Sequence, residues 1–219
     1  MTATAAPRRE LRTRQARWAG ALARWLGARG VRPNAVSVTS VLFALLAGAA
    51  LWMAGSSEWR SAPLYVMAAA GIQLRLLCNM LDGMLAVEGG MKSALGDIYN
   101  DLPDRIADAV ILIGAGYAVH DSSWGVTLGW AAALLAVMTA YVRVLGGSLG
   151  ATQRFLGPMA KQHRMFVLTV ACLLAALERT AGWPARAVWW ALAIIVAGSL
   201  VTTARRVVRI ARELTATAR

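Results

Sequence analysis

Charged residues and cysteines are both scarce in this chain. Of its 219 residues only 16% are Asp, Glu, Lys or Arg, whereas 58% are hydrophobic. So little charge argues against an ordinary soluble domain, and the length is too short for two membrane domains. The only cysteines, Cys78 and Cys172, lie within apolar stretches, where we expect small buried hydrophobes and neither a disulfide nor a cysteine-bound metal. One polytopic membrane domain is the simplest interpretation.

Acidic residues are the scarcer sign of charge. Eleven Asp and Glu stand against twenty-three Lys and Arg, giving a net charge of +12. In a soluble protein this balance would suggest nucleic acid, but here the basic residues cluster beside apolar spans. Anionic lipid headgroups and cytoplasmic anchoring explain them better, so we expect membrane lipids and no nucleic acid as partners. A cleavable signal peptide is also not evident, because basic residues precede the first apolar run: Arg8, Arg9, Arg12, Arg14 and Arg17.

The apolar stretches predict an all-α fold, a six-transmembrane-helix bundle preceded by an interfacial amphipathic helix over 11–28. The fifth stretch is short, so spanning would require Glu178 and Arg179 to snorkel, and a re-entrant segment is the alternative. Pro103 should kink the third helix, or else begin a separate one. The expected spans are 35–55, 62–86, 93–119, 124–142, 165–177 and 187–204.

The basic residues also predict domain limits and orientation. Lys and Arg concentrate in the N-terminal arm, in the 143–164 connection and in the C-terminal tail. By the positive-inside rule, both termini and the segment around residues 79–104 are cytoplasmic. We therefore expect a basic arm with the interfacial helix over 1–34, a membrane catalytic domain over 35–204 and a basic tail over 205–219.

Polar residues gather between Asn79 and Asp104, inside an otherwise apolar chain. Ionisable groups near bilayer depth are costly, so such a cluster predicts a functional site. A solvated loop over 87–104 is the alternative, but it does not explain the regular spacing. On one helix Asn79, Asp82, Gly83 and Ala86 share a narrow arc, and on the next Gly96, Asn100 and Asp104 follow at i, i+4 and i+8. Two facing helices could thus build one oxygen-lined pocket.

This spacing resembles the CDP-alcohol phosphotransferase signature, D-x2-D-G-x2-A-R-x8-G-x3-D-x3-D. The chain reads Asn79-x2-Asp82-Gly83-x2-Ala86-Val87-x8-Gly96-x3-Asn100-x3-Asp104, with every gap in agreement. Asparagine replaces the first and third acidic residues, and Val87 replaces the arginine. The chain also resembles a bacterial branch of the family that has these asparagines and a later G-P-M-x-K-x-x-R segment, here residues 157–164.

The resemblance implies a phosphotransferase in the bacterial inner membrane, with its active site cytoplasmic, that acts as a homodimer. One or two Mg²⁺ or Mn²⁺ ions would bind the donor pyrophosphate, and the last signature acid would activate the acceptor hydroxyl so that CMP leaves. Asp104 would be the catalytic base, and Gly83, Ala86 and Gly96 would make room for the nucleotide. The metal ligands would be Asn79, Asp82, Asn100 and Asp104, with Asp101 as a further candidate that compensates for Asn100. Because two carboxylates are missing, we expect one tight ion and a weaker second one.

Basic side chains are the candidates for binding phosphate. The loss of the family arginine at Val87 leaves this role to other cations, for which Arg75, Lys92, Arg105 and Arg143 are available. Four residues on the cytoplasmic connection are expected to hold a phosphate or a lipid headgroup, although topological anchoring is the alternative: Arg143, Arg154, Lys161 and Arg164.

Several functions remain open. The favoured one joins a CDP-activated lipid, most plausibly CDP-diacylglycerol, to an alcohol, and a variant takes a CDP-linked headgroup and a lipid alcohol. A family member that has lost catalysis could instead serve as an assembly partner. A small transporter is least favoured, because it would place ionisable groups near mid-membrane and tend to show paired repeats.

Overall fold

The computed structural model describes residues 17–57, 61–87, 96–152 and 157–217, and this part of the chain forms seven helices. In chain order they are α1 (Arg17–Ala28), α2 (Pro33–Ser56), α3 (Ser61–Val87), α4 (Gly96–Ala118), α5 (Gly125–Ser148), α6 (Lys161–Thr180) and α7 (Arg186–Thr217).

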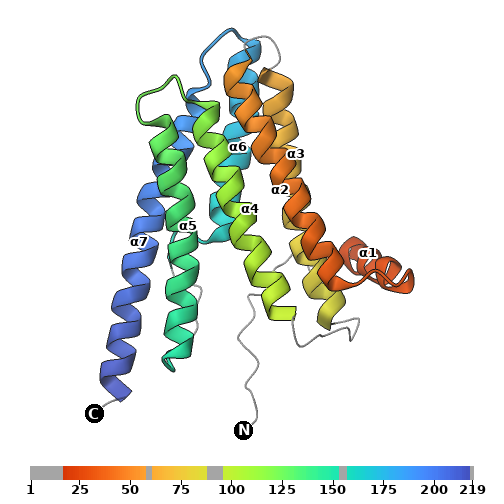
Figure 1. The fold of residues 1–219 in the computed structure, drawn as a ribbon, viewed down its shortest axis with the longest axis vertical. Coiled ribbons are helices and arrows are strands. Elements are labelled where there is room, and N and C mark those ends of the chain that lie inside the picture. Colours follow the sequence, from red (N-terminus) through yellow and green to blue (C-terminus); the bar gives the residue numbers. More distant parts are fainter. Residues whose placement is uncertain (1–16, 58–60, 88–95, 153–156, 218–219) are drawn as a thin grey trace.

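Six of these helices close into a ring. Helix α2 packs against α3 and α4, α3 against α6, α6 against α7, α7 against α5, and α5 against α4. Figure 1 shows α4 running between α2 and α5, while α1 lies beside the end of the bundle where α2 begins. Because α3 and α4 run in opposite directions, the end of α3 and the beginning of α4 share one end of the bundle. The signature residues of both helices are therefore carried to the same place.

Glycines allow α4 to contact its two neighbours backbone to backbone. A Cβ atom at Gly114 would lie 2.4 Å from the carbonyl oxygen of Gly48 on α2. A Cβ at Gly129 on α5 would lie 2.6 Å from the Cα of Gly116. Small residues at such contacts let membrane helices pack closely. Helix α4 is thus held firmly on both sides, and its acidic residues are held with it.

Four of the described helices are long and apolar enough to cross a membrane: α2, residues Ser61–Ala86 of α3, α5 and residues Arg186–Ala216 of α7. Their outer faces expose large apolar side chains, including Leu46, Trp52, Leu134 and Trp190. The protein is therefore an all-helical membrane protein. Each predicted span corresponds to one helix of the ring, but α4 and α6, which carry the charges described below, do not meet this criterion.

The helix limits correct several sequence expectations. Pro103 lies inside α4, so the alternative that it begins a separate helix is wrong. Helix α6 has 20 residues and begins at Lys161, earlier than the apolar run alone indicates. Helix α7 continues without a break past residue 204 into the basic tail, and the limits of the membrane domain remain a prediction.

At the N-terminus, α1 is the described part of the helix predicted over 11–28; residues 11–16 lie outside the described residues. Ala19 and Ala23 are buried, whereas Trp18 and Trp25 are about half exposed. The helix is present, and its interfacial role remains a prediction.

Candidate active site

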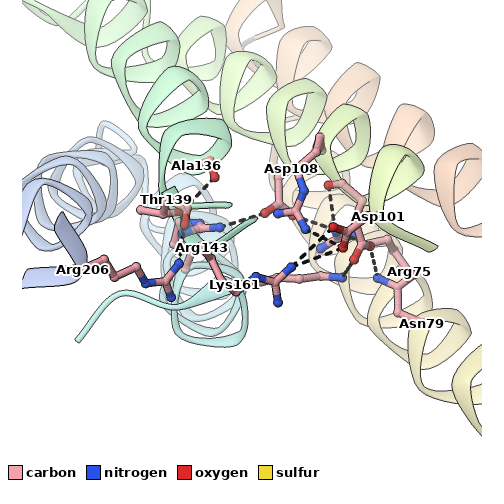
Figure 2. A network of polar contacts seen from close by, with 12 residues as sticks. Arg75, Asn79, Asp101, Asp108, Ala136, Thr139, Arg143, Lys161 and Arg206 are labelled. Carbon is pink, nitrogen blue, oxygen red and sulfur yellow. Dashed lines mark hydrogen bonds and ion pairs between the residues drawn. The ribbon is translucent and has the colours of Figure 1, made fainter. Parts of the chain in front are cut away.

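The end of α3, the first half of α4 and the start of α6 meet in a network of charged side chains. Figure 2 shows it extending from Asn79 and Arg75 on α3, past Asp101 and Asp108 on α4, to Arg206 on α7. These elements are far apart in sequence, so the network exists only in the folded bundle.

Asp104 makes the most polar contacts of the signature side chains that the structure describes. Its Oδ1 accepts hydrogen bonds from Nδ2 of Asn79 at 2.6 Å and from Nη2 of Arg75 at 3.2 Å. Its Oδ2 forms an ion pair with Nζ of Lys161. The structure thus brings together the first and last signature positions, one from each helix, as the spacing predicts. The orientation of the Asn79 amide follows from its hydrogen bond to the carboxylate.

Asp82 lies one helical turn after Asn79 on the same face of α3 and has a different environment. The hydroxyl of Ser37 on α2 donates to its Oδ2 at 2.7 Å. Its Oδ1 is buried and has no hydrogen-bond partner among the described residues. A buried carboxylate oxygen without a partner is costly, and such an orphan fits a bound cation or water.

Asp108 anchors the buried part of the network. Its two oxygens face Nη2 of Arg75 at 2.6 Å and Nη2 of Arg164 at 3.1 Å. All three residues are at most 1% exposed. Removing one partner of such a buried ion pair leaves an uncompensated charge and costs about 3–5 kcal/mol. Helices α3, α4 and α6 are therefore tied together through this one carboxylate.

Further polar contacts extend the network to α5 and α7. Nη1 of Arg164 donates to Oγ1 of Thr139 at 3.2 Å and to the carbonyl oxygen of Met159 at 2.9 Å. Arg206 donates to the carbonyl oxygen of Thr139. Asp101 is nearer the rim, with Nη2 of Arg105 at 3.2 Å. Arg143 also reaches Asp101, at 3.4 Å.

Lys161 lies where the buried network meets the rim, and 24% of its side chain is exposed. Loss of water around the ammonium lowers the pKa of Lys161, and the positive charge of Arg75 lowers it further, while Asp104 and Asp108 raise it. Burial therefore disfavours the charged ammonium, and the two carboxylates offset only part of that effect.

Several predicted site residues lie partly or wholly outside the described residues. Asn100 lies in α4 and Val87 at the end of α3, but the side chains of both are outside the described residues, as are Lys92 and Arg154 altogether. Gly96 begins α4, and Gly83 and Ala86 are half-buried on α3. The roles assigned to all of these remain predictions.

The oxygen atoms present suit a hard divalent cation, which prefers carboxylate and amide oxygens as ligands. Oδ1 of Asp82, which has no hydrogen-bond partner among the described residues, is the best-placed metal ligand, and Asn79 and Asp104 follow on the same two helices. Within the described residues no three His, Cys, Asp or Glu side chains form a metal-binding group. The predicted ligand set therefore depends on the amide oxygens of Asn79 and Asn100 as well as on the two carboxylates, and it remains a prediction.

Four residues of the network had no role in the sequence interpretation: Ser37, Asp108, Thr139 and Arg206. A signal existed for Asp108, because Asp104 and Asp108 lie at i, i+4 on one helix while Lys161 and Arg164 lie at i, i+3 on another. Asp108 also ends an acidic stripe in the sequence, formed with Asp97, Asp101 and Asp104 at i, i+4, i+7 and i+11. This pattern does not indicate which residue Asp108 pairs with. Nothing local distinguishes Ser37 or Thr139 from other hydroxyls in apolar helices.

Comparison with known proteins gives distant relatives. No protein-family model matches the chain. The inner membrane protein YnbA of Escherichia coli is 24% identical over 65% of this chain and 67% of its own length. The phosphatidylinositol phosphate synthase of Mycobacteroides abscessus is 23% identical over 81% of this chain and 76% of its own. An uncharacterized protein of Aquifex aeolicus is 26% identical over 85% of each chain.

Solved structures give a closer match in fold. The phosphatidylinositol phosphate synthase PgsA1 of Mycobacterium tuberculosis with CDP-DAG bound superposes with a TM-score of 0.74 at 18% identity, covering 89% of this chain and 94% of that one. The same enzyme in complex with manganese and citrate gives a TM-score of 0.73, covering 88% of each chain. The chain therefore has the fold of this synthase, and the resemblance to the CDP-alcohol phosphotransferase family is confirmed.

Proposed function

We propose that the chain is a membrane-embedded CDP-alcohol phosphotransferase of phospholipid biosynthesis. It transfers a phosphatidyl or phospho-alcohol group from a CDP-linked donor, with CDP-diacylglycerol as the favoured donor, to an acceptor alcohol and releases CMP. The observation that carries the proposal is the signature itself. Asn79 of α3 and Asp104 of α4 meet at 2.6 Å in a fold shared with a solved enzyme that was crystallised with CDP-DAG.

Transfer between two oxygens requires charge neutralisation, positioning and a base. A bound Mg²⁺ or Mn²⁺ would neutralise the donor pyrophosphate and polarise it toward attack. Asp82 would hold that ion with its free oxygen, and Asn79 and Asn100 would add amide oxygens. The small residues Gly83, Ala86 and Gly96 would leave space beside these ligands for the CMP moiety.

Asp104 would remove the proton from the acceptor hydroxyl. In the structure both of its oxygens are engaged, so it must part from at least one donor before it can accept a proton. Arg75 also bonds the backbone carbonyl of Asp104, at 3.3 Å, and would keep the residue in place while the other contacts change.

Six spans are proposed, although α4 and α6 fail a criterion based on composition. That criterion counts charges, whereas several charges of these helices are paired across the bundle interior, with each other or with Arg75 of α3. Paired ionisable groups facing the bundle are tolerated within a membrane. By charge distribution, both termini and the active site face the cytoplasm of a bacterial cell. A homodimer is proposed from the family resemblance.

A catalytically impaired assembly partner is the second candidate. It is favoured by the complete occupation of Asp104 by Asn79, Arg75 and Lys161. Oδ1 of Asp82 favours the enzyme instead, because an inactive scaffold has no need of a buried carboxylate oxygen that lacks a hydrogen-bond partner among the described residues.

The test is CMP release by purified protein in detergent with CDP-diacylglycerol, MnCl₂ or MgCl₂ and a panel of alcohols. Release that requires both an alcohol and the metal supports the proposal, and the productive alcohol identifies the acceptor. CDP-linked headgroups with diacylglycerol form the second arm, which tests the reversed roles. No release in either arm, from protein that binds CDP-diacylglycerol, supports the assembly partner.

A further inference from the structure

The segment 157–164, Gly-Pro-Met-Ala-Lys-Gln-His-Arg, has no step of its own in the proposed reaction. Its first residue, Gly157, has a φ of +115°, and a Cβ there would lie 2.5 Å from the Thr202 side chain on α7. The backbone N–H of Met159 donates to Oγ1 of Thr202 at 3.0 Å. The turn is therefore fixed against α7, and it determines where α6 begins.

Helix α6 begins in a way that local preferences disfavour. Lys161 is its first residue and Arg164 follows in the next turn, although the N-terminus of a helix carries a partial positive charge. The first turn holds no acidic residue, and Ala160 makes no side-chain cap. A break with local rules of this kind is expected at functional sites. Residues outside α6 offset the unfavourable interaction between these cations and the helix N-terminus.

The compensating charges come from α4, in matching register. Lys161 pairs with Asp104, and one turn later Arg164 pairs with Asp108. Arg164 is buried, and its only ion-pair partner among the described residues is Asp108. Its other contacts are hydrogen bonds to Thr139 and to the carbonyl oxygen of Met159. Lys161 is the cation of the pair that reaches the rim of the site. The turn at 157–160 thus places one partly exposed lysine against one signature carboxylate.

The two signature carboxylates consequently differ in what they can offer to an added cation. Asp104 has a hydrogen-bond or ion-pair partner on each oxygen, whereas Oδ1 of Asp82 is buried without a hydrogen-bond partner among the described residues. A metal ion can reach Oδ2 of Asp104 only by displacing the ammonium already there, and an ion pair in a partly buried site resists such exchange. At Oδ1 of Asp82 the described part of the chain places no ion-pair partner that a metal ion would have to displace.

We propose that Lys161 is a built-in cation of the site: it occupies Asp104, so that each chain binds a single divalent ion through Asp82 and the lysine ammonium provides the second positive charge beside the donor pyrophosphate. This inference rests on the proposed function for the identity of the donor. It assigns the 157–164 segment a role, which is to set the ammonium in place. It also gives a reason for asparagine at position 79, because an amide can donate to Asp104 where a carboxylate would repel it.

The test is a Mn²⁺ titration of the detergent-purified full chain without added nucleotide, followed by electron paramagnetic resonance of free Mn²⁺. Wild-type protein should bind one Mn²⁺ per chain. Lys161→Met should bind a second ion, or bind Mn²⁺ about tenfold more tightly, because the competing ammonium is gone. Lys161→Arg keeps the charge and should resemble the wild type. Arg209→Met, which removes a cation from an exposed pair with Glu213 on α7, should leave Mn²⁺ binding unchanged.

Two outcomes overturn the inference alone: wild-type protein that binds two ions, or Lys161→Met protein with the wild-type stoichiometry and affinity. The wild-type count decides even if the Met variant does not fold, since one ion supports the inference and two contradict it. Wild-type protein that binds no Mn²⁺ contradicts the proposed function as well. Failure to release CMP, with one ion bound and the expected change in Lys161→Met, contradicts the proposed function and leaves the role of Lys161 supported.

Discussion

Arg75 of α3 places one guanidinium nitrogen 2.6 Å from Asp108 of α4, and neither residue is more than 1% exposed. The same nitrogen lies 3.2 Å from Asp104, the proposed base. The buried ion pair therefore fixes the position of a residue at the rim of the site. Its strength should be visible in the stability of the whole bundle.

Replacing Asp108 with Asn should destabilise the protein strongly. The change removes the carboxylate that Arg164 pairs with and leaves Arg75 with Asp104 alone, at a cost of about 3–5 kcal/mol. Thermal unfolding in detergent, followed by circular dichroism, should show a clearly lower midpoint. Asp121→Asn is the matched control, because that carboxylate is 87% exposed and pairs only with His120 among the described residues. If both variants have the same unfolding midpoint as the wild type, the buried ion pair does not stabilise the bundle.

Close helix contact can be tested at Gly114. Alanine there would place a Cβ 2.4 Å from the Gly48 carbonyl oxygen, a backbone atom that cannot move aside without shifting α2. We expect a lower unfolding midpoint and lower CMP release, because α4 carries the signature acids. Gly20→Ala in α1 should be tolerated, since its Cβ would meet only the flexible end of Arg24 at 3.3 Å. Equal stability of the two variants would show that the contact between α2 and α4 can relax.

Ser37 should affect metal binding through Asp82. Its hydroxyl is the donor that orients this carboxylate, and loss of a hydrogen bond to a buried charge is worth about 1–3 kcal/mol. Ser37→Ala should weaken Mn²⁺ binding roughly tenfold by titration. Thr39→Ala, on the exposed face of the same helix, removes only a bond to the carbonyl of Ala35 and should bind Mn²⁺ as the wild type does. Unchanged affinity in the Ser37 variant would argue against Asp82 as a ligand.

Restoring the family carboxylate at position 79 should make stability depend on metal. Asn79→Asp sets a carboxylate against Asp104, where the amide now donates at 2.6 Å, so the metal-free variant should unfold at a lower temperature than the wild type. Added MnCl₂ should raise its midpoint more than that of the wild type, because a ligand that binds only the folded state stabilises it. A midpoint that does not respond to Mn²⁺ would remove position 79 from the ligand set.

The sequence predicted the helices well because most of them contain a long apolar run. It predicted their ends less well, since the start of α6 depends on a turn packed against Thr202 of α7, which has no local signal. Pro103 was also ambiguous, because one lost backbone donor can be absorbed when the helix is packed closely on both sides.

The candidate site was predicted in part. Helix periodicity predicts which signature residues share a face of one helix. The structure then brings Asn79 and Asp104, one from each helix, into contact. The cations were harder to place. Arg164 was expected to bind phosphate, and the structure shows it buried against Asp108, which depends on the register of α6 against α4. Tertiary packing decides such a register, so the pattern of one helix could not reveal it.

Asp104 is proposed to activate the acceptor alcohol for attack on the CDP-linked donor. Comparison of CMP release from wild-type, Asp104→Asn and Asp121→Asn proteins, each with matched CDP-diacylglycerol binding, measures this role. We expect release from the wild type and the Asp121 variant, and a loss of at least about a hundredfold in the Asp104 variant, the low end of what a general base contributes. An Asp104→Asn protein that releases CMP at the wild-type rate would contradict it.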